Sequence, residues 1–193
     1  MLLARAALVG SVLVLAGCPA HDLPACHVVP ADGGAVGGGS NAVEAVLVAA
    51  GEDGALIEIH DGSPVPLVSA PQGGHIMLVG AKLKGSSDCM LDATGDLRDP
   101  TTRRVIGLDQ RSLLLSSGSD GWAQPSDPAL SSMPNVAVCP SAAASKSIDG
   151  NPYTVELALV DGDGKSVAML SATVTPMCPA GDDYCHTECS PGG

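Results

Sequence analysis

The chain has 193 residues, enough for a single domain, and a formal charge of −12 from 21 acidic and 9 basic residues. This acidic balance argues against a nucleic-acid partner, because affinity for phosphate backbones depends on clustered Lys and Arg. The chain has no Phe, one Trp and two Tyr. It therefore has little of the aromatic surface on which sugars or single-stranded bases stack.

The first seventeen residues have the composition of an export signal. One early positive charge, Arg5, precedes an uncharged apolar run at residues 6–16. The run is too short for a permanent membrane-spanning helix, which needs about 20 residues, but it fits the hydrophobic region of a secretory signal. We therefore predict that residues 1–17 are a cleaved signal peptide.

The signal ends in Leu15-Ala16-Gly17-Cys18, which resembles the lipobox of bacterial lipoproteins. The resemblance implies cleavage between Gly17 and Cys18, a diacylglyceryl group on the Cys18 thiol and acylation of the new amine. Several acyl chains on one residue anchor a protein stably, since each buried methylene contributes about 0.8 kcal/mol. The open alternative is an ordinary secretory signal followed by an incidental cysteine.

A Gly-rich stretch follows the lipobox and includes the sequence ADGGAVGGGSN at residues 31–41. Gly and Ser remove backbone preference, so this composition is typical of a flexible linker. We predict that residues 18–42 form a lipidated tether with a reach on the order of 25 to 30 Å. The tether would allow the folded part to stand clear of the membrane.

Residues 43–178 show apolar and polar alternation interrupted by turn residues at short intervals, which indicates β-strands. The sequence shows no convincing helix longer than the signal. The pattern predicts one all-β domain, an antiparallel β-sandwich of about seven strands, followed by a cysteine-bearing tail at residues 179–193. The candidate strands are 56–60, 74–79, 89–98, 104–109, 113–115, 135–139, 153–160 and 167–175.

The clearest hairpin is YTVELALVDGDGKSVAMLSATV at residues 153–174, two alternating strands around an Asp-Gly-rich turn. It resembles the last two strands of bacterial immunoglobulin-like domains, in particular polycystic-kidney-disease-type and cadherin-like repeats. That resemblance implies an immunoglobulin-like sandwich. The chain as a whole resembles single-domain lipoproteins of Gram-negative bacteria, which implies a place in the cell envelope and no particular activity.

The chain contains seven cysteines, an odd count that is unusual for an exported protein. If Cys18 carries lipid, the remaining cysteines can form three disulfides in an oxidising compartment. Fifteen pairings are possible, and the sequence does not choose among them. The candidates are Cys26, Cys89, Cys139, Cys178, Cys185 and Cys189.

Two patterns raise the alternative of a metal-binding lipoprotein. Asp161 and Asp163 begin like a calcium loop, but the remaining loop ligands are missing and Asp-Gly is also the usual composition of a hairpin turn. The tail brings three cysteines close to His186, as in a zinc site, but it has no C-x2-C pair and export favours oxidised sulfur. We therefore expect no cofactor and keep Asp161, Asp163 and His186 as the weak metal candidates.

A second alternative, an envelope hydrolase, has no motif behind it. The sequence contains no G-x-S-x-G, H-E-x-x-H or S-x-x-K, so we predict no catalytic residue and no small-molecule substrate. His75 follows a Gly pair at the start of a strand, where a hydrogen bond to backbone is the usual role.

We therefore predict a binding, adhesion or structural module of the cell envelope, held in the membrane by the acyl chains on Cys18. Loops around residues 118–128 and 140–150 would contact an envelope or surface protein. Pro19, rather than an inner-membrane retention Asp, follows Cys18, which favours the outer membrane.

Overall fold

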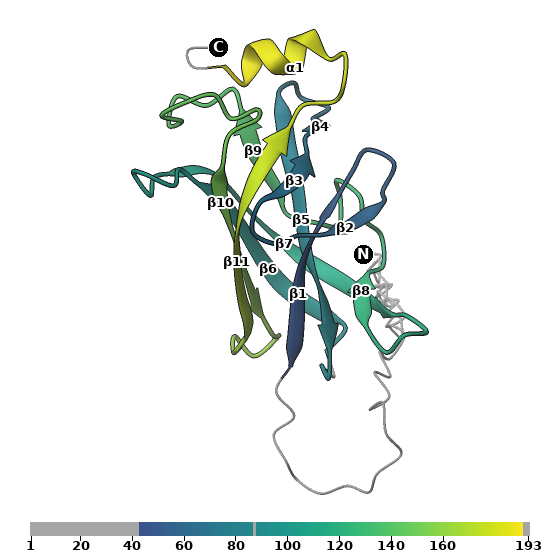
Figure 1. Ribbon diagram of the computed structural model, residues 1–193. Coiled ribbons are helices and arrows are strands. Elements are labelled where there is room, and N and C mark those ends of the chain that lie inside the picture. The colour runs from purple at the N-terminus through teal and green to yellow at the C-terminus, as the bar shows by residue number, and fades with distance from the viewer. Residues whose placement is uncertain (1–42, 87, 191–193) are drawn as a thin grey trace, which may run out of the picture.

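The computed structural model describes residues 43–86 and 88–190, which form one all-β unit (Figure 1). The predicted signal peptide, the lipidation site Cys18, the tether and Cys26 lie outside the described residues. The prediction of an all-β fold is confirmed, since the described part contains eleven strands and one short helix. The one helix of the described part lacks the length and apolar composition of a membrane span.

The strands follow the chain without a long helical interruption. Their bounds are β1 Glu44–Ala50, β2 Leu56–Glu58, β3 Ser63–Pro66, β4 Val68–Ser69, β5 His75–Lys84, β6 Met90–Arg98, β7 Val105–Ser117, β8 Ala123–Pro125, β9 Asn135–Cys139, β10 Tyr153–Val160 and β11 Ser166–Met177. The helix α1, Asp183–Glu188, lies in the cysteine-bearing tail.

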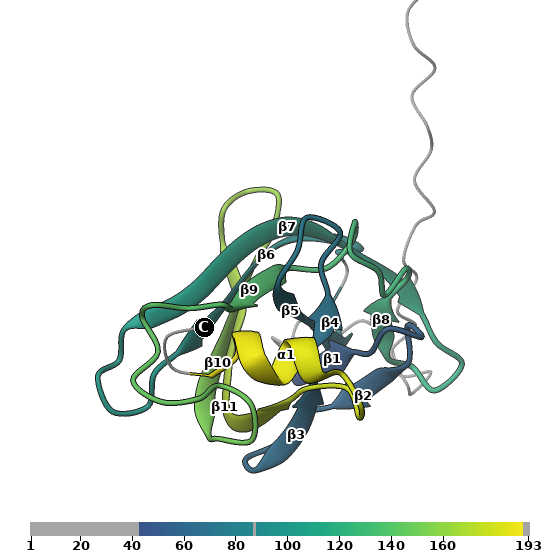
Figure 2. The ribbon, with the colours of Figure 1, turned by 90° about the horizontal axis from the view of Figure 1, so that it is seen from above.

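The strands pair in the order β2-β1-β5-β8-β7-β6-β10-β11-β3, and β4 and β9 also pair with β5. The long strand β7 connects the two halves of this path, because it pairs with β6 over most of its length and with β8 at its end. The strands curve around a common core, and α1 lies across one end of it (Figure 2).

The predicted alternation is clearest in β10, where Tyr153, Val155, Leu157 and Leu159 are buried and the residues between them are half-buried. β5 is different, because nearly all of its residues are buried. β6 and β7 approach the neighbouring strands so closely that glycine is required. A Cβ on Gly107 of β7 would lie 1.8 Å from the Ala137 carbonyl oxygen of β9.

The strand map differs from the predicted one in four respects. Candidates 104–109 and 113–115 are one strand, β7. β1 was not predicted, because its sequence EAVLVAA is a nearly continuous apolar run whose last four residues are all buried. β3 pairs parallel with β11, whereas the sequence predicted antiparallel strands only. The short strands raise the number to eleven instead of about seven.

Candidate functional site

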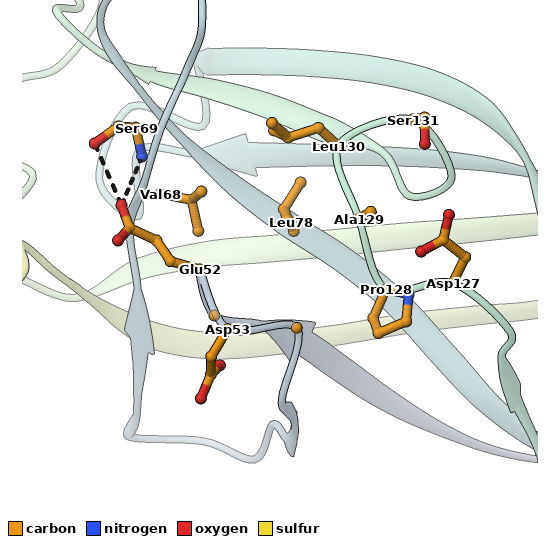
Figure 3. A pocket seen from close by; sticks show the side chains of 12 residues that line it. Glu52, Asp53, Val68, Ser69, Leu78, Asp127, Pro128, Ala129, Leu130 and Ser131 are labelled. Carbon is orange, nitrogen blue, oxygen red and sulfur yellow. Dashed lines mark hydrogen bonds between the residues drawn. The ribbon is translucent and has the colours of Figure 1, made fainter.

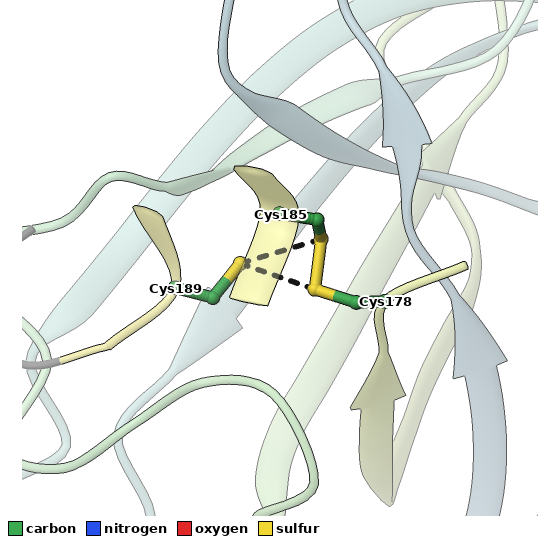
Figure 4. Close-up of side chains that lie close together, drawn as sticks. All are labelled: Cys178, Cys185 and Cys189. Atoms are coloured by element: carbon green, nitrogen blue, oxygen red, sulfur yellow. Dashed lines mark hydrogen bonds between the residues drawn. A yellow bond between two sulfur atoms is a disulfide. The ribbon is translucent and has the colours of Figure 1, made fainter. Parts of the chain in front are cut away.

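Two disulfides fix the C-terminal tail. Cys139, at the end of β9, bonds to Cys189, and Cys178, just after β11, bonds to Cys185 in α1. The Cys189 sulfur lies 3.8 Å from the sulfurs of both Cys178 and Cys185, so the bonds form one buried cluster (Figure 4). Cys89 is also disulfide-bonded. All five described cysteines are therefore oxidised.

The zinc alternative is not favoured by this geometry. The sulfurs of Cys178, Cys185 and Cys189 lie close enough together for a metal site, but sulfurs in disulfides are not thiolates, and the thiolate is the metal ligand. His186 is near Asp149 and Cys178, where its Nδ1 lies 2.8 Å from Asp149 Oδ2. The structure therefore gives the weak candidate His186 a carboxylate partner.

The Asp161–Asp163 candidate forms the turn between β10 and β11. Asp161 Oδ1 accepts hydrogen bonds from the backbone N–H groups of Asp163, at 3.0 Å, and Lys165, at 2.8 Å. Neither aspartate belongs to a group of three or more potential metal ligands in the part of the chain that the structure describes. Their local contacts are those of a hairpin turn.

His75 connects β5 to the tail and is only 2 % exposed. Its Nδ1 lies 3.0 Å from Glu188 Oε2, and its Nε2 lies 3.3 Å from Asp182 Oδ2. An ionised carboxylate only accepts, so both contacts are hydrogen bonds when both ring nitrogens carry protons. The expectation of a backbone partner was wrong, because the tail brings two carboxylates to this strand from more than 100 residues away.

Asp182 also begins the helix α1. Its Oδ1 accepts the backbone N–H of Cys185 at 2.9 Å, the usual arrangement of an N-cap. This hydrogen bond, followed by the contact with His75, lowers the pKa of Asp182 below its ordinary value of 3.8. One carboxylate thus caps the helix and contacts β5.

Asp99 holds a second region in place. It is fully buried at the end of β6, and its Oδ1 accepts backbone N–H groups from Thr101 at 2.9 Å and Thr102 at 2.8 Å. Its Oδ2 accepts the N–H and the hydroxyl of Ser145. The Ser145 hydroxyl is the main reason that the pKa of Asp99 lies far below its ordinary value. The predicted contact loop at 140–150 is therefore bonded to the domain at this point.

A groove of about 700 Å³ lies beside the turn between β1 and β2 (Figure 3). Glu52 and Asp53 border it on one side, Asp127 borders it on the other, and Val68 and Leu78 lie between them. We call this the acidic lobe. Asp127 and the adjacent Pro128 belong to the contact loop at 118–128, so the structure places one end of that predicted loop on the groove.

A second hollow, of about 590 Å³, shares residues 51–53 with the acidic lobe. Most of its other lining residues are apolar, and we call it the apolar lobe. Ile57 of β2 and Met177 of β11 are exposed large hydrophobic residues in its wall. The two lobes together are the composite groove, and each lobe by itself falls within the range of volumes typical of ligand sites. The other apolar residues of this lobe are Ala55, Pro64, Pro66, Leu67 and Pro179.

Sequence reasoning did not identify Glu52 or Asp53 as binding candidates, and it included Asp127 only as part of the contact loop at 118–128. Each stands in a turn, where an acidic residue is expected for local hydrogen bonding, so no local pattern distinguishes them. Comparison of the chain with protein-family models, with curated proteins and with solved structures gave no match.

Proposed function

We propose that the protein is a lipid-anchored module of the bacterial cell envelope that binds a partner through the composite groove and carries out no chemistry. The observation that carries the proposal is that all five described cysteines are in disulfides. Disulfides persist in exported proteins and are rare in the cytosol. An oxidised domain fits the export signal and lipobox read from the sequence.

The groove supports a binding role rather than a catalytic one. Both ring nitrogens of His75, the most deeply buried of the described histidines, meet carboxylates, which leaves neither free to take a proton from a nucleophile in this geometry. Among the described residues, the lining of the composite groove includes no histidine, and the one cysteine in it, Cys178, is in a disulfide. The open volume of the groove and its carboxylates without ion pairs are suited to binding a partner.

The anchor is tested by replacing the lipidated residue. Cys18→Ser should move the exported protein from the membrane fraction to the soluble periplasmic fraction. Cys26→Ser, which leaves the lipobox intact, is the matched control and should stay with the membrane. Density separation of the two membranes tests the proposed outer-membrane location. A Cys18→Ser protein that still sediments with membranes would contradict the proposal.

The predicted disulfide of Cys26 lies outside the described residues and stays a prediction. The structure pairs Cys139, Cys178, Cys185 and Cys189 among themselves. Peptide mapping of the protein without reduction should find Cys26 in a disulfide. A free Cys26 thiol would count against the predicted set of three bonds.

We also infer that the domain is a divergent immunoglobulin-like sandwich. The inference is supported by the β10–β11 hairpin, which pairs along its whole length, and by the packing of Gly95 in β6 against Val79 of β5. The parallel β3–β11 pair and the shared strand β7 are departures from the expected pattern. A crystal structure with β6, β10 and β11 facing β1 and β5 as separate layers would support the inference, and one closed barrel would contradict it.

A further inference from the structure

We propose that the composite groove binds an extended peptide in which a Lys or Arg side chain stands next to an apolar side chain. This inference rests on the proposed binding function and adds the chemical class of the partner. It follows from three features of the groove: unpaired carboxylates, an adjoining apolar wall and a strand edge without N–H donors.

The carboxylates of the acidic lobe are held in place but are not neutralised. Glu52 Oε1 accepts the N–H and hydroxyl of Ser69, both at 3.3 Å, and Asp127 Oδ2 accepts the Ser132 hydroxyl at 2.9 Å. Asp53 Oδ1 accepts the N–H of Ala55 at 2.9 Å. None of the three makes an ion pair within the described ranges.

Among the residues that the structure describes, no Lys, Arg or His lines either lobe. The positions facing the solvent-filled space therefore carry negative charge only, and the net charge of the chain has the same sign. A cationic side chain would gain from this field without displacing a cation of the protein. An anionic ligand would meet repulsion from Glu52, Asp53 and Asp127.

The apolar lobe begins where the acidic lobe ends, at the shared residues 51–53. Ile57 and Met177 expose 38 % and 42 % of their surface there, and Pro64 and Pro66 complete the wall. A ligand that fills both lobes therefore needs a cation and an apolar group on one short chain. Alternating side chains of an extended peptide provide that arrangement.

The edge of β3 favours a peptide with an extended backbone, rather than a small amine, as the ligand. β2 and β3 are the two ends of the strand order, and both border the apolar lobe. The Leu67 N–H donates to the Met177 carbonyl at 2.9 Å, so by alternation the backbone groups of Pro64 and Pro66 point away from β11. Proline has no N–H. That edge offers carbonyl oxygens, which the N–H groups of a peptide can satisfy.

The experiment measures binding of the fluorescein-labelled peptide Ser-Leu-Lys-Leu-Lys-Ser by anisotropy, using the full exported chain with Cys18→Ser. Matched peptides replace Lys with Glu or Leu with Ser, and both should bind more weakly. The double variant Glu52→Gln, Asp127→Asn keeps the acceptors for Ser69 and Ser132. It should weaken binding of the Lys peptide about fivefold, from two partly screened ion pairs.

Two control variants separate the groove from general charge and apolar surface. Asp161→Asn with Asp163→Asn removes the same charge from the β10–β11 turn, which lines neither lobe, and should leave the affinity within about twofold. Ile57→Thr should weaken binding about threefold through lost apolar contact. Leu108→Thr, at an exposed site on β7 away from the groove, should not.

Equal binding of the Lys and Glu peptides, no binding of either, or no effect of the Glu52 and Asp127 changes would overturn the inference. A photo-crosslinker at position 57 in intact cells distinguishes failure of the peptide inference from failure of the proposed binding function. Adducts to a segment without neighbouring basic and apolar residues overturn the peptide class while leaving the binding role in place. Labelling no stronger than at position 108 counts against the groove as the binding surface.

Discussion

The tail and the composite groove use acidic residues in opposite ways. In the tail, Asp149 pairs with His186, and Asp182 and Glu188 pair with His75. In the groove, Glu52, Asp53 and Asp127 are held only by hydroxyl and backbone N–H groups. The first set stabilises a contact within the protein, and the second leaves negative charge facing open space. The same residue type therefore has different roles according to whether the chain itself supplies a histidine partner.

The tail and the composite groove are also in contact. Cys178, which the Cys178–Cys185 disulfide ties to α1, lines the apolar lobe, and its N–H donates to Asp149 Oδ1 at 2.8 Å. The tail thus supports one wall of the groove. Changes in the tail are expected to reduce stability first, whereas changes in the acidic lobe are expected to reduce binding with little effect on stability.

The largest expected effect is the loss of the long-range disulfide. Cys139→Ala with Cys189→Ala opens a bond that spans 50 residues and should lower the free energy of unfolding by about 4 kcal/mol. Cys178→Ala with Cys185→Ala opens one that spans 7 residues and should cost about 2.5 kcal/mol. Urea denaturation measures both. Equal losses would contradict the chain-entropy explanation.

The next effect concerns two histidines, His75 of β5 and His186 of α1. His75→Asn removes the buried member of the contact with Asp182 and Glu188 and should lower the free energy of unfolding by about 3 kcal/mol. His186→Asn removes an ion pair whose histidine is 46 % exposed, so its effect should stay below about 1 kcal/mol. Thermal melts of both variants provide the comparison. A similar cost for the two would show that burial of His75 contributes nothing.

Acid should weaken the tail through Asp182. The pKa of Asp182 is lowered in the folded protein, mainly by the Cys185 N–H, so near that pKa the unfolded chain binds more protons. The stabilisation is therefore present above the ordinary value of about 4 and is lost as the pH falls through the folded pKa. Unfolding followed from pH 6 to pH 2 should be less pH-dependent in Asp182→Asn. Identical pH profiles of the variant and the parent protein would refute this.

The smallest expected change in stability is in the groove. Glu52→Gln with Asp127→Asn removes two unpaired negative charges, so the free energy of unfolding should change by less than about 0.5 kcal/mol. A small gain is the expected sign, because like charges repel in a chain of net charge −12. A loss of several kcal/mol in denaturant titration would show that these carboxylates stabilise the fold instead of awaiting a partner.

The parts of the fold that depend on the local sequence pattern were predicted correctly. The alternation of Tyr153 to Leu159 and the Asp-Gly turn after it are properties of a short stretch of chain, and they form β10 and its hairpin. β1 was missed because burial of its last four residues removes the alternation that marks a strand. The helix α1 was missed because a segment of six residues carries too little periodicity to be recognised.

The amino-acid sequence by itself determined the all-β class, the main hairpin and the supply of cysteines for disulfides, since these depend on side-chain periodicity, turn chemistry and composition. Only the tertiary structure decided which cysteines bond, that His75 meets Asp182 and Glu188, and that β3 lies parallel to β11. It also brought together residues 51–54, 64–67, 127–131 and 177–179 as one groove. Apart from the Cys178–Cys185 bond, which spans 7 residues, these contacts join segments distant along the chain, so packing of the whole domain, and not local preference, determines them.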